Sequence, residues 1–257
     1  MGKHKLDLEG RVAIVTGAGQ GIGAAIAEVF VEQGAMVVLA DLNQENLEHQ
    51  VKRIQDQVTT EERVLGLRTD VTKSKDVVAT VTKACERFGT VDILVNNAGI
   101  AKGTGIEGIS KEEWDQVLDV NINGVFLCSQ AVLPIMKRNG YGRIINMASI
   151  AGRSVSTIGG AHYTTSKAAV LGFTRAVAKE TGGWGITVNA VCPGFIDTEM
   201  SRLHCSPEQT LAYVSTYPIP RIGQPGEVAD TVLFLASDSA SYITGAAIDV
   251  NGGDLMI

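Results

Sequence analysis

Residues 11–23 read RVAIVTGAGQGIG, in which a short apolar run leads into four alternating glycines. The run has the length and the β-branched residues of a buried strand. Glycines allow a tight turn, and the apolar pattern over residues 21–33 predicts a helix after it. The amino end of such a helix presents free N–H groups and a positive dipole, which suit a pyrophosphate. The stretch therefore predicts the first unit of a dinucleotide-binding fold.

Apolar runs alternate with helical patterns along the rest of the chain. The predicted strands cover residues 11–16, 36–40, 64–69, 91–95, 143–147, 186–191 and 246–250. The predicted helices cover residues 21–33, 43–57, 74–88, 111–118, much of 120–138, 162–181 and 227–236. Fully apolar strands in such an alternation indicate a parallel sheet covered by helices on both faces. We therefore predict an α/β fold, a single Rossmann-type domain over residues 1–257 with a seven-stranded parallel sheet.

Bulk composition excludes several classes of protein. The net charge of −6 gives no footprint for nucleic acid or for an anionic membrane. We expect neither a signal peptide nor a membrane span, because the first residues are polar and no run approaches eighteen apolar residues. The four cysteines are scattered, which fits a cytoplasmic protein, and no side chains stand at metal-ligand spacing, so no metal is expected.

Asp41 ends the second predicted strand, twenty residues after Gly21. A carboxylate at this place can accept hydrogen bonds from both hydroxyls of an adenosine ribose, whereas it repels a 2′-phosphate. The neighbouring Gln20 and Leu42 are uncharged and offer that phosphate no partner. The sequence therefore favours NAD over NADP.

Further motifs follow the strands in order, and together they resemble the short-chain dehydrogenase/reductase family over about residues 8–253. The spacing T-G-x-x-x-G-x-G at residues 16–23 departs from G-x-G-x-x-G and is the form used by that family. The other matching motifs are Asp70-Val71, NNAG at 96–99, Asn121, Ser149, YTTSK at 163–167, Pro193-Gly194 and Thr198. The resemblance implies catalytic roles for Asn121, Ser149, Tyr163 and Lys167. It implies cofactor contacts by Gly17, Gln20, Gly21, Ile22, Gly23, Asp41, Leu42, Asp70, Val71, Asn97, Ala98, Gly99, Tyr163, Lys167, Pro193, Gly194, Ile196 and Thr198.

Tyr163 is the predicted acid and base of a hydride transfer, in which nicotinamide carries the hydride. Lys167 lies four residues later and shares its helix face. Its charge, with that of oxidised nicotinamide, should lower the pKa of the phenol from near 10 toward neutrality. The hydroxyl of Ser149 can hold the substrate oxygen near Tyr163.

Asn121 has a different role in the resemblance. It holds open a helix carbonyl that binds water and links Lys167 to solvent. Asn123, two residues later, is the rival assignment.

The substrate pocket should be lined by residues 100–103, 150–153 and 194–220, of which 194–220 is expected to be a mobile lid. The candidate substrate contacts are Ile150, Arg153, His162, Phe195, Arg202 and Tyr213. Arg153 and Arg202 suit a carboxylate or sulfonate, and solvated surface arginines are the equally expected alternative.

These observations favour an NAD(H)-dependent oxidoreductase that interconverts a small secondary alcohol, polyol, sugar or hydroxy acid and its ketone. A 3-oxoacyl-[acyl-carrier-protein] reductase is the alternative. Such reductases usually take NADPH and need basic residues to dock the acidic carrier protein. In this chain the stretch NGYG after Arg138 and the stretch GGWG at 182–185 contain no basic residue. A non-catalytic dinucleotide-binding protein has no need of Ser149, Tyr163 and Lys167.

The resemblance also implies a homotetramer that pairs helices 120–138 and 162–181 across one axis and the last strands across another.

Overall fold

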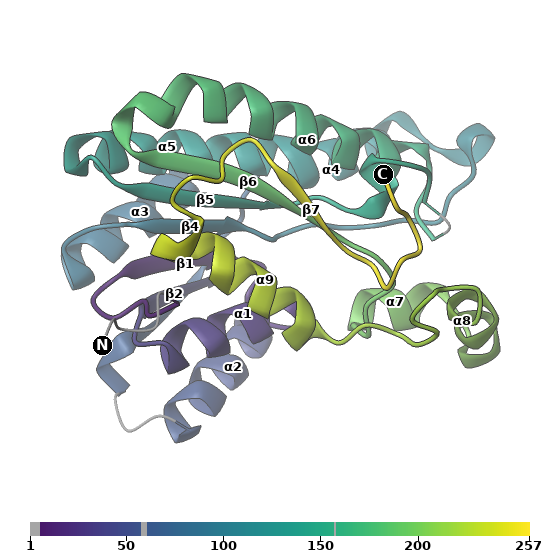
Figure 1. Ribbon diagram of the computed structural model, residues 1–257, viewed down its shortest axis with the longest axis horizontal. Helices are drawn as coiled ribbons and strands as arrows, with labels where there is room; N and C mark the ends of the chain where they lie inside the picture. The colour runs from purple at the N-terminus through teal and green to yellow at the C-terminus, as the bar shows by residue number, and fades with distance from the viewer. Residues whose placement is uncertain (1–5, 58–60, 157) are drawn as a thin grey trace.

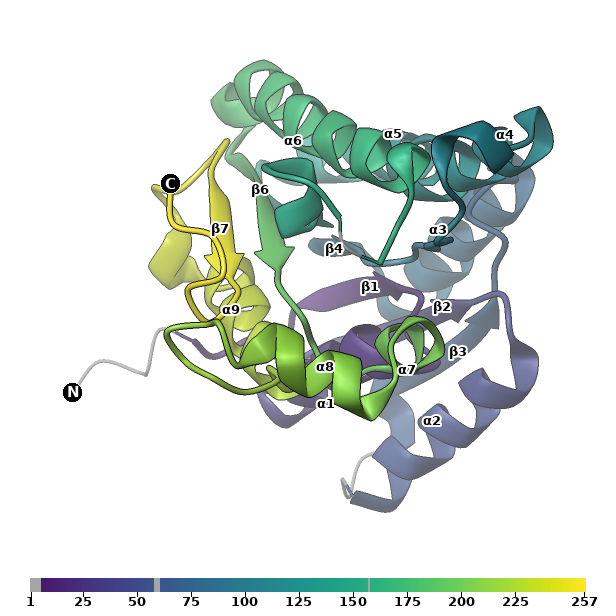
Figure 2. The same ribbon diagram turned by 90° about the vertical axis from the view of Figure 1, so that its right-hand side faces the viewer.

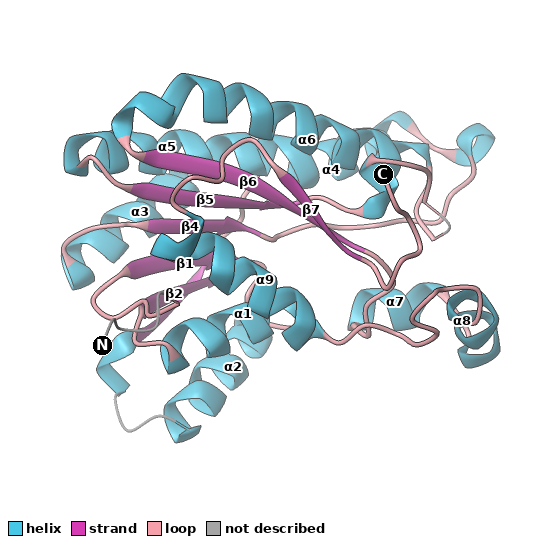
Figure 3. Ribbon diagram, in the orientation of Figure 1, coloured by secondary structure: helices cyan, strands magenta, loops and turns pink. Residues whose placement is uncertain are grey.

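Seven parallel strands form one twisted sheet in the computed structural model, which describes residues 6–57, 61–156 and 158–257. Their order across the sheet is β3-β2-β1-β4-β5-β6-β7, as Figure 1 and Figure 3 show. The strands are β1 (Val12–Thr16), β2 (Met36–Asp41), β3 (Val64–Arg68), β4 (Ile93–Asn96), β5 (Gly142–Met147), β6 (Ile186–Pro193) and β7 (Ala247–Val250). The predicted fold class is confirmed, and the strand bounds differ from the prediction by one or two residues.

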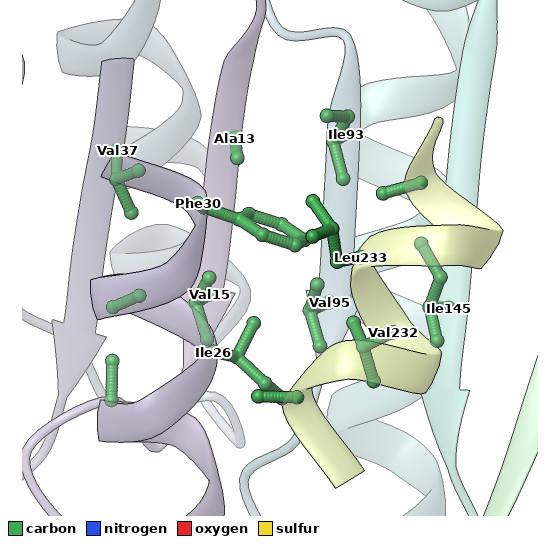
Figure 4. Close-up of a cluster of buried hydrophobic side chains, with 14 of the residues drawn as sticks. Ala13, Val15, Ile26, Phe30, Val37, Ile93, Val95, Ile145, Val232 and Leu233 are labelled. Carbon is green, nitrogen blue, oxygen red and sulfur yellow. The ribbon is translucent and has the colours of Figure 1, made fainter. Parts of the chain in front are cut away.

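Helices cover both faces of the sheet because successive strand residues point to opposite sides. One face carries α1 (Gly21–Glu32), α2 (Gln44–Gln57) and α9 (Pro225–Ala236). The other carries α3 (Ser74–Phe88), α5 (Gly124–Asn139) and α6 (Ala161–Thr181). In β1, Val15 packs into the first layer and Ile14 into the second. Figure 4 shows Phe30 of α1 and Leu233 of α9 meeting above β1 and β4.

The strand order reverses beside β1, which has β2 on one side and β4 on the other. Ligands of such sheets bind outside the carboxyl ends of the strands at this point. Figure 2 looks onto that edge, and two short helices, α7 (Glu199–His204) and α8 (Pro207–Val214), project over it. Phe195, Val214 and Tyr217 form a small hydrophobic cluster under α8 that is separate from the two large layers.

Both short helices lie in the segment that the sequence predicts only as a lid. Thr198 caps α7 and Ser206 caps α8, each in a reciprocal capping box, and Pro207 occupies the first position of α8. These caps order helices that are too short to show a hydrophobic period. The mobility of this segment stays a prediction.

The helical stretch Lys111–Asn139 also differs from the prediction. It joins α4 (Lys111–Leu118) to α5 through a π-helical turn, Asp119–Asn123, without a break. By length and mean hydropathy it meets the criteria for a membrane-crossing helix, which the sequence did not lead us to expect. The same composition suits a helix that packs on a sheet, as α5 does on β4 and β5.

Candidate active site

Two adjoining cavities lie at the carboxyl edge of the sheet. The long cavity, of about 400 Å³, is bounded by the glycine-rich loop, the end of β2 and the turns after β3 and β4. The inner cavity, of about 140 Å³, lies between the end of β5, the start of α6 and the segment after β6. Both cavities are lined by Ile22, Asn97, Gly99, Thr198 and Met200. They therefore form one continuous cleft with a wide end and a narrow end.

Glycines shape the loop at the wide end. Gly17 and Gly21 have positive φ angles of 62° and 57°, a conformation that other residues rarely adopt. A Cβ on Gly23 would lie 2.1 Å from the carbonyl oxygen of Gly17 and 2.5 Å from Asn97 Nδ2. Gly23 does not line the long cavity, contrary to its predicted cofactor contact, and instead lets α1 pack closely against the loop. Backbone N–H groups at this helix start are available to a phosphate.

Asp41 lies between the glycine-rich loop and the start of α2. Its Oδ2 accepts a hydrogen bond from the N–H of Gly19 at 2.8 Å, and its Oδ1 accepts one from the N–H of Asn43 at 2.9 Å. Asn46, which the sequence analysis missed, donates to Gln20 Oε1 at 2.8 Å and also lines the long cavity. Among the described residues that line this cavity there is no lysine or arginine. The wide end is therefore electrically negative around Asp41.

The turns after β3 and β4 complete the wide end. Burial acts to raise the pKa of Asp70, but two hydrogen bonds from Thr72 outweigh it and hold that pKa below its usual value. Thr16 Oγ1 accepts from the N–H groups of Asn97 and Ala98, both at 3.0 Å. Asn97 Nδ2 in turn donates to the carbonyl of Gly17 at 2.9 Å. Thr16, which was not predicted as a site residue, thus fixes the NNAG turn against the glycine-rich loop.

Tyr163, Ser149 and Lys167 meet in the inner cavity. Ser149 lies two residues after the end of β5 and lines the inner cavity beside Tyr163, and its Oγ accepts from the N–H of Ala151 at 3.1 Å. Lys167 Nζ donates to the carbonyl of Met147 at 2.7 Å and lies 5.8 Å from the centre of the Tyr163 ring. The three predicted side chains are therefore brought together by the end of β5 and the first turns of α6.

Burial dominates the protonation of this group. It raises the pKa of Tyr163, and the Ser149 hydrogen bond only partly opposes that rise. It also lowers the pKa of Lys167 to about 8. The expectation that Lys167 and oxidised nicotinamide together lower the pKa of Tyr163 concerns the cofactor-bound site and stays a prediction. The phenol is therefore neutral at pH 7 and can donate a proton.

Asn121 lies in the π-helical turn and is buried. Its side chain accepts from the N–H of Ile100 at 2.8 Å and donates to the carbonyl of Ile100 at 2.9 Å and to Ser166 Oγ at 3.0 Å. A Cβ on Gly99 would lie between Asn121 Oδ1 and Lys167 Nζ, at 3.4 and 3.5 Å. Asn123 is exposed and bonded to Asp119, so the structure places Asn121, and not its rival, beside the site. Single π turns of this kind are frequent at functional sites.

The predicted substrate contacts divide into two groups. Ile150, Phe195 and Tyr213 line the inner cavity. Met200, within the predicted stretch 194–220, also lines it, and the sequence analysis missed two further apolar lining residues, Val155 and Ile158. Val155 and Ile158 lie in a loop rich in glycine and serine, where isolated apolar side chains were the only signal.

Arg153, Arg202 and His162 do not line the inner cavity, so their prediction as substrate contacts is wrong in this structure. Arg153 is directed to β7, where its Nε lies 3.3 Å from Asp249 Oδ1. Arg202 forms an exposed ion pair with Asp197 at 2.9 Å. His162 is fully buried and faces α4. Lys167 is therefore the one cationic side chain among the described residues around the inner cavity.

Known proteins resemble this chain over almost its whole length. The family model described as enoyl-(acyl carrier protein) reductase matches residues 17–254. The 3-oxoacyl-[acyl-carrier-protein] reductase FabG of Vibrio cholerae is 41% identical over 252 residues, which cover 98% of this chain and 100% of that protein. The short-chain reductase protein NovJ of Streptomyces niveus is 41% identical over 248 residues, 94% of this chain and 93% of NovJ. Among solved structures, levodione reductase has a TM-score of 0.90 and 35% identity, covering 95% of this chain and 97% of its own.

Proposed function

The chain belongs to the short-chain dehydrogenase/reductase family, whose members are oxidoreductases that bind a nicotinamide cofactor, and from this we propose that it uses NAD(H) to interconvert a small neutral secondary alcohol and its ketone. The observation that carries the proposal is the meeting of Ser149, Tyr163 and Lys167 in a cavity that opens into the dinucleotide cleft.

In this proposal Tyr163 transfers the proton. Its neutral phenol donates to the carbonyl oxygen of a ketone, while the Ser149 hydroxyl, which lines the same cavity, holds that oxygen. The buried Lys167 ammonium stabilises the phenolate that remains after the transfer. The bound cofactor supplies the hydride in reduction and accepts it in oxidation. Asn121 positions the backbone of Ile100 and the start of α6 around this group.

The choice of NAD rests on the wide end of the cleft. Asp41, Gln20 and Leu42 surround the position of the adenosine ribose in this fold, and none of them carries a positive charge. Gly19 lets Asp41 lie close against the loop, because a Cβ there would lie 3.0 Å from Asp41 Oδ2.

The preference for a neutral substrate rests on the inner cavity. Side chains such as Ile150, Val155, Ile158, Phe195 and Met200 make it largely apolar. Both arginines predicted for an acid group are engaged in ion pairs elsewhere. A hydroxy acid would therefore bring a carboxylate into an apolar cavity without an arginine partner, at a cost on the order of several kcal/mol. Among the substrate classes that the sequence left open, a neutral alcohol fits best.

A 3-oxoacyl-[acyl-carrier-protein] reductase is the second candidate. The 41% identity to the Vibrio cholerae protein of that name favours it, and an apolar cavity also accepts an acyl chain. Against it, the turn before β6 presents Trp184, half exposed and with Lys137 Nζ 5.6 Å from its ring centre, in place of a free arginine. An acidic carrier protein binds better to free cations than to an aromatic ring.

One assay separates the two candidates. The purified protein is given a panel of neutral alcohols and ketones, a matched hydroxy acid and 3-oxoacyl thioesters on coenzyme A and on acyl carrier protein, each with NAD(H) and NADP(H). We expect nicotinamide absorbance to change with neutral ketones and NADH, and Tyr163→Phe to abolish the change. Faster turnover of the carrier-protein thioester with NADPH would overturn the proposal in favour of the second candidate.

For assembly and location we propose a cytoplasmic homotetramer. Phe126 on α5 is exposed, an apolar groove between α3 and α5 is lined by Val81 and Ile135, and β7 is an edge strand of the sheet. Such surfaces are suited to burial between identical subunits. The four cysteines are free thiols, as expected in a reducing compartment. Light scattering should give four times the chain mass of 27.1 kDa, and a monomer would contradict this.

A further inference from the structure

Both ring nitrogens of His162, the residue before Tyr163, are engaged in hydrogen bonds. Nδ1 accepts from the backbone N–H of Tyr163 at 2.9 Å. Because an accepting nitrogen carries no proton, the proton of the neutral ring is on Nε2, which lies 3.0 Å from Glu113 Oε1. The geometry thus fixes one tautomer, in which His162 donates to Glu113 and accepts from Tyr163.

The bond to Tyr163 replaces a missing helix cap. α6 begins at Ala161, and its N-cap residue is Gly160, which has no side chain to accept a hydrogen bond. Tyr163 occupies the third helical position, and the N–H at this position normally donates a hydrogen bond to the side chain of the N-cap residue. His162 supplies that acceptor from within the helix, in addition to the Gly160 carbonyl at 3.1 Å.

His162 is itself held in place by α4. The imidazole is fully buried and stacks on Trp114, with ring centres 6.5 Å apart and planes inclined by 30°. Hydrogen bonds from Thr104 and from His162 hold the pKa of Glu113 below its usual value, so the acceptor is an ionised carboxylate. The ring therefore cannot turn without breaking both of its bonds or leaving the stack.

The loop after β4 joins the same arrangement. The carbonyl of Lys102 accepts from the N–H of Gly160 at 2.7 Å, and the Thr104 side chain helps to lower the pKa of Glu113. Residues 102–104 and α4 are thereby connected to the turn that carries Tyr163. His162 does not line the inner cavity, so this arrangement acts on the backbone of Tyr163 and not on a substrate.

We infer that Glu113 and His162 are a positioning pair that fixes the first turn of α6 and so the Tyr163 hydroxyl relative to Ser149. The inference rests on the proposed role of Tyr163 as the proton donor. A hydroxyl displaced by about 1 Å from its productive place costs roughly a hundredfold in rate, so the pair affects the chemical step far more than binding.

Matched variants test the inference against the wild-type rate. His162→Leu removes both bonds, whereas His162→Asn keeps an acceptor near the position of Nδ1. Glu113→Ala removes the partner of Nε2, whereas Glu113→Gln keeps an acceptor oxygen. His49→Leu on the exposed face of α2 controls for the loss of a histidine. We expect His162→Leu and Glu113→Ala to lower kcat roughly ten- to hundredfold, with the substrate KM and the NADH Kd within about twofold.

The conservative variants should stay within about threefold of the wild-type kcat. Wild-type kcat in folded His162→Leu would overturn the inference, as would an equal loss of kcat in His162→Leu and His162→Asn.

Nitrogen-15 spectra of histidine-labelled protein give a readout without turnover. They should show His162, assigned by its loss in His162→Asn, with the proton on Nε2. A proton on Nδ1 would overturn the inference even if no ketone were reduced. Absence of wild-type turnover with intact Nε2–H tautomer would instead refute the proposed function.

Discussion

Neutralising Asp41 should shift the cofactor preference toward NADP(H). Asp41→Asn keeps the size of the side chain and removes its charge. In the wild type, a 2′-phosphate on the adenosine ribose would lie close to a carboxylate, with no cation among the described lining residues to offset it. Two unit charges 4 Å apart repel by about 1 kcal/mol in water and about 4 kcal/mol at an effective dielectric constant of 20.

Asp41 is only partly buried, so the lower part of that range applies. We expect the repulsion to weaken NADPH binding by about 1 to 3 kcal/mol, which is roughly five- to 150-fold in Kd. Asp41→Asn should recover most of this factor. It should also weaken NADH binding several-fold, because an amide has one acceptor oxygen and the carboxylate serves the N–H groups of both Gly19 and Asn43.

Fluorescence titration of NADH and NADPH at fixed low ionic strength measures both effects. Glu199→Gln is the matched control, because this carboxylate also lines the long cavity but lies near Gly21 and not near the end of β2. Its loss should change both affinities together and leave their ratio unchanged. Equal affinities of the wild type for the two cofactors, or an unchanged ratio in Asp41→Asn, would refute the reasoning.

Tyr163→Phe should lower kcat at least a hundredfold and leave the NADH Kd within twofold, since the phenol acts only on the proton; residual turnover above a tenth of wild type would contradict its role. Ketone reduction should fall as the pH rises through about 8, because the Lys167 ammonium is lost there, and a pH profile flat from 7 to 9 would exclude that dependence. Between pH 8 and 10.5 the unfolded chain binds a proton at Lys167 that the folded chain does not, so the free energy of unfolding rises with pH in that window. The full destabilisation by the buried ammonium group is present below pH 8. Lys167→Met should therefore be inactive yet more stable to urea at pH 7, by about 2 kcal/mol, and a less stable variant would show that the cost is absent. Gly23→Ala should destabilise the protein by about 1–3 kcal/mol and weaken NADH binding, because its Cβ meets the Gly17 carbonyl, whereas Gly226→Ala in α9 meets nothing within 4 Å and should be neutral in thermal unfolding.

The sheet and the wide end of the cleft could be predicted because their signals are local. Most strands are short and mainly apolar, the glycine-rich loop directly follows the first of them, and Asp41 directly follows the apolar run of the second. Residues at the carboxyl ends of parallel strands share one edge, so their proximity follows from the topology alone.

The narrow end was harder to predict because it depends on partners far apart in the chain. His162 and Glu113 are 49 residues apart, and nothing near His162 indicates that its ring faces α4. Arg153 is engaged by Asp249 on the last strand, which no local pattern shows. Burial raises the pKa of Tyr163, and a sequence shows the neighbouring charge of Lys167 but not that burial.

The small hydrophobic cluster of Phe195, Val214 and Tyr217 has a consequence for how this enzyme can change. It stabilises α8 independently of the two layers that hold the sheet, and it adjoins the inner cavity through Phe195 and Tyr213. The helix beside the inner cavity is thus stabilised by other hydrophobic contacts than those that hold the sheet beneath the cofactor cleft. Exchange of residues 201–217, which do not line the long cavity, is therefore expected to change substrate selectivity while the sheet beneath keeps its stability.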